Sequence, residues 1–155
     1  MHCIGLLQLM CSLPYEIHTV NFVAAELIDE DQKKAFEELV VNGKIVVNSF
    51  TAEEVMEIVA EHSSVSGNLS IPDCSVCYYA KKHDVPMITG DRRLRRHAEK
   101  LSIEVHGILF LFDDMVANSV ISPIDAANKL EELMTLNSRL PQAAIRERID
   151  KWRGR

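Results

Sequence analysis

The sequence predicts an α/β fold in which helices cover both faces of a central parallel sheet. Short β-branched segments alternate with helical segments along the 155 residues, and this alternation is typical of parallel sheets. The composition is 47% hydrophobic and 26% charged, which is ordinary for a globular chain that can bury one sizeable core. The sequence contains no internal repeat and no low-complexity linker, so it predicts a continuous globular organisation.

Cap and turn residues set the boundaries of the elements predicted in the first half. Asn42 and Gly43 tolerate the left-handed conformation that ends a helix. Thr51 and Glu54 have the spacing of a capping box, which opens the next helix. The predicted elements are a helix over 5–12, a strand over 15–19, helices over 20–27 and 30–41, a strand over 44–50, and a helix that begins after Thr51.

The second half alternates in the same way. Ser70 is a helix-capping residue, and Pro72 is tolerated in the first helical turn. Ser122 followed by Pro123 is a second cap of this kind. The predicted elements are a loop over 63–68, a helix over 70–83, strands over 85–89 and 103–106 with a helix over 92–100 between them, helices over 107–118 and 122–136, and a last helix that opens at 140–141.

Three acidic residues lie where a parallel sheet places its functional sites, near strand ends and on core-facing helix edges. Asp91 follows the predicted strand over 85–89, Asp73 heads an apolar helix face, and Glu26 borders another. Asp73 and Asp91 have a plainer interpretation as helix caps, and Glu26 as a surface acid. Together they predict one acidic pocket, and hard divalent cations such as Mg²⁺ or Mn²⁺ prefer these oxygen ligands.

Four arginines follow Asp91 directly, on the helix predicted over 92–100. At 100° per residue Arg92, Arg95 and Arg96 share one side, and we expect them to contact the phosphates of a nucleic-acid backbone. Arg93 points elsewhere and should matter less. The alternatives are a solvated face, or pairing of these arginines with the acidic first part of the chain. The formal net charge of −6 argues against indiscriminate nucleic-acid binding.

Two further features bear on cofactors and on localisation. Cys74 and Cys77 form a CxxC inside a helical segment, and no second Cys or His pair has the spacing of a zinc site. We therefore expect both to be small core residues in a reducing cytosol. The apolar N-terminal stretch is shorter than the roughly 20 residues of a membrane span, and no basic residue precedes its apolar run as in a secretion signal. These features predict a cytoplasmic protein without a membrane partner.

The segment over 69–116 resembles the C-terminal half of a PIN domain. In that family an Asp precedes a helix, a short strand ends in T-x-D, an arginine-containing helix follows, and a later strand ends in V-x-G. The matching residues here are Asp73, Thr89 to Asp91, and Val105 to Gly107. Upstream, Glu26 matches the glutamate of the family's earlier helix. The resemblance covers about residues 5–120, so we expect a PIN-like domain over 1–120 and a helical extension over 121–155 packed on it.

The resemblance implies a metal-dependent endoribonuclease with a three-layer α/β/α sandwich. In this interpretation Glu26, Asp73 and Asp91 are the catalytic carboxylates and hold Mg²⁺ or Mn²⁺, and Thr89 supports them. Many bacterial members of the family are toxins of type II toxin–antitoxin pairs, which usually form dimers and are neutralised by a small antitoxin. The expected partners are therefore single-stranded RNA, a small antitoxin protein and a second copy of the chain.

The sequence departs from the family at its beginning. PIN domains open with a hydrophobic strand that ends in Asp, and no segment here matches that strand. We expect four strands, with the central first strand and its acid missing. Two alternatives to the nuclease stay open. One is a catalytically inactive PIN-like domain that binds RNA or a protein, and the other is a plain α/β module whose acids are all caps.

Overall fold

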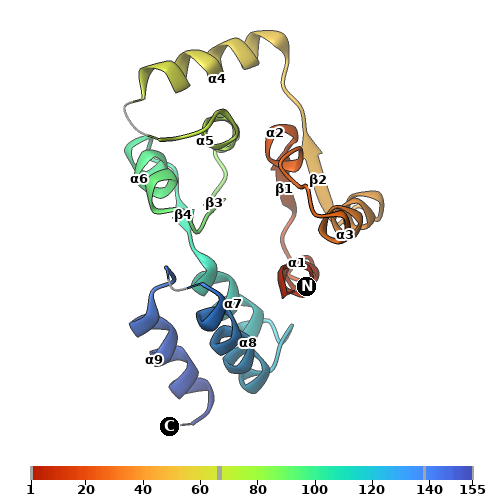
Figure 1. Ribbon diagram of the computed structural model, residues 1–155, viewed down its shortest axis with the longest axis vertical. Coiled ribbons are helices and arrows are strands. Elements are labelled where there is room, and N and C mark those ends of the chain that lie inside the picture. The colour runs from red at the N-terminus through yellow and green to blue at the C-terminus, as the bar shows by residue number, and fades with distance from the viewer. Residues whose placement is uncertain (1, 66–67, 138, 155) are drawn as a thin grey trace. The chain divides into compact units, whose positions relative to one another are not determined.

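The computed structural model describes residues 2–65, 68–137 and 139–154, and the chain divides into two compact units between His106 and Gly107 (Figure 1). The elements of the first unit are α1 (His2–Met10), β1 (Ile17–Val20), α2 (Asn21–Ala24), α3 (Glu30–Val41), β2 (Ile45–Asn48), α4 (Ala52–Ser64), α5 (Ile71–His83), β3 (Met87–Ile88), α6 (Arg92–Lys100) and β4 (Val105–His106). Those of the second unit are α7 (Ile108–Ala117), α8 (Pro123–Leu136) and α9 (Gln142–Trp152).

Four strands occur among the described residues, at the four places that the sequence predicts. They form two separate parallel pairs, β1 with β2 and β3 with β4 (Figure 1). Ile17 pairs with Ile45 at the start of the first sheet, and Met87 pairs with Val105 in the second. Each strand therefore has one hydrogen-bonded neighbour and one edge outside its sheet. Such two-stranded sheets depend on the helices that cover them.

The main core of the first unit surrounds α5. Cys74 and Cys77 of this helix are fully buried, as predicted for core cysteines, and pack with Met87 of β3 and with Leu94 and Ala98 of α6. Helix α4 adds one fully buried side chain, Ile58. Burial of apolar side chains at this density is the main source of the unit's stability. The core also fixes which face of α6 points outward, because Leu94 and Ala98 occupy the inner face.

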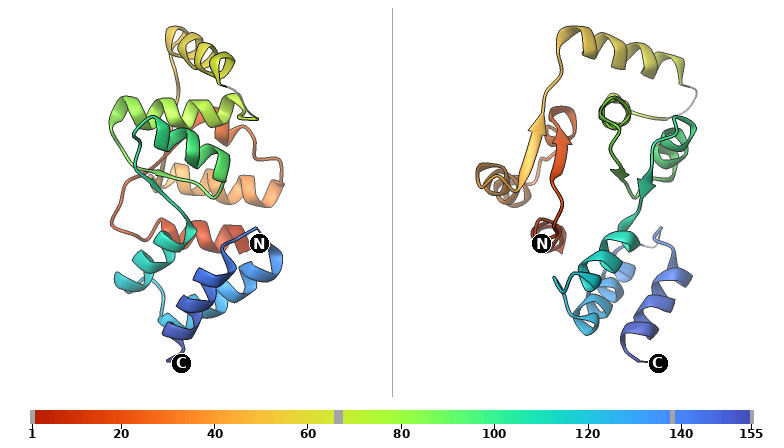
Figure 2. Two further views of the ribbon diagram at one scale, coloured as in Figure 1. Left: turned by 90° about the vertical axis from the view of Figure 1, so that its left-hand side faces the viewer. Right: turned by 180° about the vertical axis from the view of Figure 1, so that it is seen from behind.

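The second unit is a group of three helices, in which α8 and α9 lie side by side (Figure 2). Phe112 and Met115 of α7, Leu130 of α8 and Ile145 of α9 are fully buried. The two nitrogens Nε and Nη2 of Arg148 donate to both carboxylate oxygens of Asp113, at 2.9 to 3.1 Å. This two-pronged contact joins α9 to α7.

The element boundaries agree with the sequence prediction best where a cap is present. Helices α3 and α6 have the predicted bounds, and the capping box at Thr51 and Glu54 is formed. The predicted helix over 20–27 is wrong in length, because α2 ends at Ala24. Part of the predicted loop over 63–68 lies outside the described residues, and α4 extends to Ser64. No described helix is long and apolar enough to span a membrane.

Contacts place α7 with α8 and α9, whereas the sequence predicts a domain boundary at residue 120. The helix over 108–117 therefore groups with the two helices that follow it. The predicted packing of residues 121–155 on the domain before them stays a prediction.

Candidate functional site

Asp73 completes the N-terminal cap of α5. The backbone N–H of Ser70 donates to Asp73 Oδ2 at 3.1 Å, and the N–H of Asp73 donates to Ser70 Oγ at 3.2 Å. The cap interpretation of Asp73 is thus correct, and Pro72 lies in the first turn as predicted. Its carboxylate is half-buried, and its charge is one of the lesser causes that raise the pKa of the nearby Cys74 thiol, after burial and the charge of Glu61.

Asp91 is the N-cap of α6. Its Oδ1 accepts hydrogen bonds from the backbone N–H groups of Arg93 at 2.8 Å and Leu94 at 3.2 Å. The N–H of Asp91 donates to the hydroxyl oxygen of Thr89 at 3.1 Å. Thr89 therefore fixes the backbone at Asp91, and its role in supporting the carboxylates stays a prediction. An acid at this place is also favoured by the positive end of the helix dipole.

Glu26 lies beyond the end of α2, in a turn where its N–H donates to the carbonyl of Val23 at 3.0 Å. The sequence predicts that a helix carries this residue, and the early end of α2 instead leaves Glu26 exposed in a connecting segment. Helix α2 does pack against α5, the helix that begins near Asp73.

The three acids do not form a metal site as they lie. Among residues 2–65, 68–137 and 139–154 no three His, Cys, Asp or Glu side chains lie close enough to hold one ion. One oxygen of Asp73 and one of Asp91 accept capping hydrogen bonds. Mg²⁺ needs several oxygens at about 2.0–2.1 Å. The present arrangement does not fit such an ion, so the predicted convergence of Glu26, Asp73 and Asp91 stays a prediction.

Helix α6 presents its arginines to solvent. Leu94 and Ala98 are 6% and 0% exposed, which orients the remaining faces of the helix outward as predicted. Arg95 Nε contacts Glu99 Oε1 at 3.2 Å, one helical turn away. No ion pair within the described parts of the chain involves the other exposed arginines of this helix, which are Arg92, Arg93 and Arg96. The helix therefore displays cations that are available to an anionic ligand.

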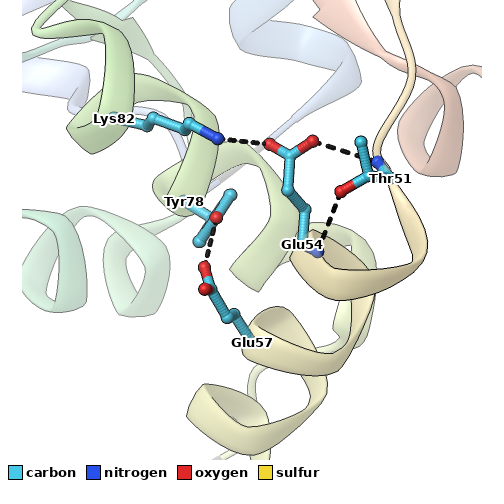
Figure 3. A network of polar contacts seen from close by, with 5 residues as sticks. All are labelled: Thr51, Glu54, Glu57, Tyr78 and Lys82. Atoms are coloured by element: carbon cyan, nitrogen blue, oxygen red, sulfur yellow. Dashed lines mark hydrogen bonds and ion pairs between the residues drawn. The ribbon is translucent and has the colours of Figure 1, made fainter.

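A polar network that the sequence did not predict holds α4 against α5 (Figure 3). Lys82 Nζ contacts Glu54 Oε2 at 2.8 Å, and the Tyr78 hydroxyl donates to Glu57. The hydrogen bond from Lys82, followed by that from the Thr51 backbone, lowers the pKa of Glu54 from 4.5 to about 2. Glu54 thus serves both its own capping box and the contact between the two helices.

A cavity of about 590 Å³ lies among α4, α5 and α6. Glu61 and His97 meet in its wall, with Oε1 and Nε2 3.0 Å apart. Burial, followed by the charge of Glu61, raises the pKa of the Cys77 thiol to about 12, so this thiol is neutral. None of the three predicted ligands Glu26, Asp73 and Asp91 lines this cavity. It is therefore not the acidic pocket that the sequence predicts.

A second cavity of about 200 Å³ is mainly apolar and lies among α1, β1, α2 and α3. Val23, Leu27 and Phe36 line it, and Ile28, which follows Leu27 in the sequence, is 89% exposed. Helices α2 and α3 bury no side chain completely. This half of the first unit is therefore less tightly packed than the core around α5.

Comparison with known protein families gives the class of the fold. A model described as PIN domain matches residues 1–153, nearly the whole chain, so the protein belongs to the PIN domain family. This confirms the predicted family and its α/β fold class, and places the chain in a nuclease-like family. PIN domains generally use divalent metals. The match includes the helices after residue 120. No curated protein matches the chain.

Proposed function

We propose that this PIN domain binds single-stranded RNA through α6 and cleaves it as a Mg²⁺- or Mn²⁺-dependent endoribonuclease. The observation that carries the proposal is the exposed arginine group that begins one residue after Asp91. Guanidinium groups bind phosphate oxygens with two parallel hydrogen bonds, and an exposed group on a rigid helix can follow a nucleic-acid backbone. Asp91 caps that same helix, so the RNA would lie against the predicted carboxylate.

Within α6 the arginines should contribute unequally. Arg92 and Arg96 have no ion-pair partner in the described residues, and the sequence places them on one side of the helix. Arg95 shares that side, and its contact with Glu99 must be given up before it binds phosphate. We therefore expect Arg92 and Arg96 to supply most of the phosphate affinity, with Arg95 weaker than the sequence suggested.

The cleavage part of the proposal assigns Glu26, Asp73 and Asp91 as metal ligands and catalytic carboxylates. Family membership supports this assignment, and so does the position of Asp73 and Asp91 at the starts of two helices that share one core. It requires the three carboxylates to come closer together than they lie in the structure described here. Clustered carboxylates repel each other, so an added divalent cation would favour that approach.

The test is RNA binding by the double variant Arg92→Ala plus Arg96→Ala, measured at several salt concentrations. The binding constant falls as salt rises, and each lost contact to a single strand should make the slope of log K against log salt less steep by about 0.7. The loss of both contacts should make it less steep by about 1.4. Arg146→Ala plus Lys151→Ala on α9 is the matched control, because it removes the same charge from another helix. If the slope of the α6 variant equals that of the parent chain, the proposal for this helix is wrong.

A second candidate is a PIN-type domain that binds RNA or a protein without cleaving RNA. It is favoured by the use of Asp73 and Asp91 as caps, and by the lack of a three-ligand group among the described residues. Cleavage of single-stranded RNA that needs Mn²⁺ and stops with chelator would exclude it. RNA binding of normal strength without any cleavage would support it over the nuclease.

The family also motivates a proposal about context. We propose a cytoplasmic toxin of a type II pair, which forms a dimer and binds a small antitoxin. Expression of the chain alone should then slow growth, and co-expression of a small protein encoded beside it should restore growth. Normal growth at high expression of the folded chain would contradict the toxin role and leave the RNA-binding test unaffected.

A further inference from the structure

The cavity of about 590 Å³ among α4, α5 and α6, here called the α4–α6 cavity, has the wall of a small-ligand site. Its volume lies within the roughly 300–1,000 Å³ that is usual for such sites. Apolar side chains form part of the wall, and they include Val65, Cys77 and Leu101. Its polar and charged side chains are Glu57, Glu61, Ser64, Tyr78, Lys81, Lys82 and His97. This mixture suits a ring that has apolar faces and a polar edge.

Glu61 offers hydrogen-bond acceptors at a fixed place in this wall. Its Oε1 lies 3.0 Å from His97 Nε2, and the two side chains are only 24% and 13% exposed. An ionised carboxylate can only accept, so the imidazole donates to Oε1 and holds the carboxylate in place. Within the described parts of the chain, Oε2 of Glu61 has no hydrogen-bond partner. A carboxylate has about four acceptor sites, so both oxygens can take a further N–H donor.

Two lysines supply donors to the same cavity. Lys82 Nζ contacts Glu54 Oε2 at 2.8 Å (Figure 3), and Lys81 Nζ donates to the carbonyl of Leu101 at 2.8 Å. Each ammonium group has three N–H donors, and each of these contacts uses one of them. The wall therefore presents acceptors from α4 and donors from α5. It matches a ligand whose edge carries both kinds of group.

Among the RNA bases, guanine has the edge that fits this arrangement. Its N1–H and N2–H groups lie side by side and can donate to the two oxygens of one carboxylate, while O6 and N7 accept. Adenine and cytosine have a ring-nitrogen acceptor in place of N1–H, and uracil has a carbonyl on each side of its single N–H. The lone pairs of these acceptors would repel the carboxylate of Glu61.

Helix α6 connects the α4–α6 cavity to the proposed RNA-binding surface. His97 and Leu101 of this helix line the cavity, and His97 directly follows Arg96. Arg93 and Lys100 are exposed, and at about 100° per residue both lie between Arg96 and the cavity side of the helix. A strand whose phosphates contact Arg96 therefore has further cations on the way to the cavity. The bases of single-stranded RNA can turn out of their stack into such a site.

We propose that the α4–α6 cavity binds one guanine base of a single-stranded RNA whose phosphates lie along α6. Glu61 accepts from N1–H and N2–H of the base, and Lys81 and Lys82 donate to its O6 and N7. His97 is a positioning residue, because it acts through the carboxylate of Glu61. The inference rests on the proposed RNA-binding function of α6. It adds a sequence preference, which phosphate contacts alone do not give.

The first test compares two RNAs on the unmodified protein, a short oligouridylate with one central guanosine and the same strand with one central adenosine. Two-pronged contacts to a base discriminate by at least about fivefold, so the guanosine strand should bind at least about fivefold more tightly. It should also shift the NMR signals of Glu61, Val65 and Lys81, which the adenosine strand should leave nearly unchanged. Free GMP should shift the same signals only at much higher concentration, because it lacks the other contacts to α6.

A pair of variants tests the role of the Glu61 carboxylate. Glu61→Gln puts amide N–H donors opposite those of the base, so the preference for the guanosine strand should disappear. Glu53→Gln is the matched control, because Glu53 is exposed on the same helix, loses the same charge and does not line the cavity. It should keep the preference of the parent chain. Thermal unfolding checks that both variants are folded, and the comparison on the parent chain needs neither of them.

Each outcome decides for or against the guanine site. Equal affinity of the parent chain for the two RNAs would overturn the site and leave the phosphate contacts of α6 standing. Binding of GMP without any binding of RNA would overturn both. A preference that Glu61→Gln keeps, or shifted signals away from the cavity, would place the base elsewhere. A preference that disappears in Glu61→Gln and persists in Glu53→Gln would support the site.

Discussion

Replacement of Asp91 separates its role as a helix cap from a role as a metal ligand. Asp91 Oδ1 accepts hydrogen bonds from two backbone N–H groups of α6, at 2.8 and 3.2 Å. Asn caps helices about as well as Asp, whereas Ala in place of a capping residue costs about 1 kcal/mol. Asp91→Ala should therefore lower the melting temperature by about 2–4 °C in a chain of this size. Asp91→Asn should stay within about 0.5 kcal/mol of the parent.

The assay measures thermal unfolding and Mn²⁺-dependent cleavage of single-stranded RNA for both variants. We expect Asp91→Asn to keep its stability and lose cleavage, because an uncharged amide is a poor ligand for Mg²⁺ or Mn²⁺. Asp29 provides the matched control, because it caps α3 by accepting from the Gln32 N–H at 2.9 Å. Asp29→Asn should change neither property. Full cleavage by Asp91→Asn would make Asp91 only a cap, and an Asp91→Ala chain as stable as the parent would refute the cap.

Two further predictions concern the first unit. Ile58→Ala should lower the free energy of unfolding by about 2–5 kcal/mol in a denaturant titration, because Ile58 is fully buried in the core. Met56→Ala is the control on the exposed face of the same helix, and it should lower the free energy of unfolding far less. The lowered pKa of Glu54 implies a contribution to stability that is present above pH 4.5 and is lost as the pH falls toward 2. Unfolding curves over that pH range should show a smaller acid-dependent loss of stability in Lys82→Met than in the parent chain. An equal loss of stability in both chains would contradict the Glu54–Lys82 contact.

Local signals in the sequence predicted the helix ends well. Asn42 ends α3 and Asp91 begins α6 as predicted, because short polar side chains satisfy the free backbone groups at helix ends. The capping boxes at Thr51 and Ser70 were predicted for the same reason. These rules need only residues within one helical turn, so a single sequence contains the necessary information.

The end of α2 and the polar contacts between elements could not be predicted in this way. The apolar run over 20–27 has helical spacing, and nothing within it indicates that the helix stops at Ala24. The contact between Tyr78 and Glu57 joins residues 21 apart in sequence, and that between His18 and Tyr79 joins residues 61 apart. Contacts at such separations arise from packing, which local periodicity does not determine.

The candidate site was predicted as a set of residues, and the structure adds how each is held. Asp73 and Asp91 were identified from their places at the starts of helices, and both do cap those helices. Glu26 was identified from an apolar face that a longer helix would have formed. Whether the three meet depends on the conformation of residues 25–29, which lie between α2 and α3 and on which the sequence gives no local signal.

The proposed cleavage depends on the binding of one divalent cation by Glu26, Asp73 and Asp91, and a Mn²⁺ titration followed by NMR tests this proposal. Bound Mn²⁺ broadens the signals of nearby nuclei, so it reports which residues surround the ion. We expect saturable broadening centred on these three residues, which chelator reverses and Asp91→Asn greatly weakens. Broadening that is absent, that never saturates, or that centres on other acids such as Glu30 and Asp31 of α3 would contradict it.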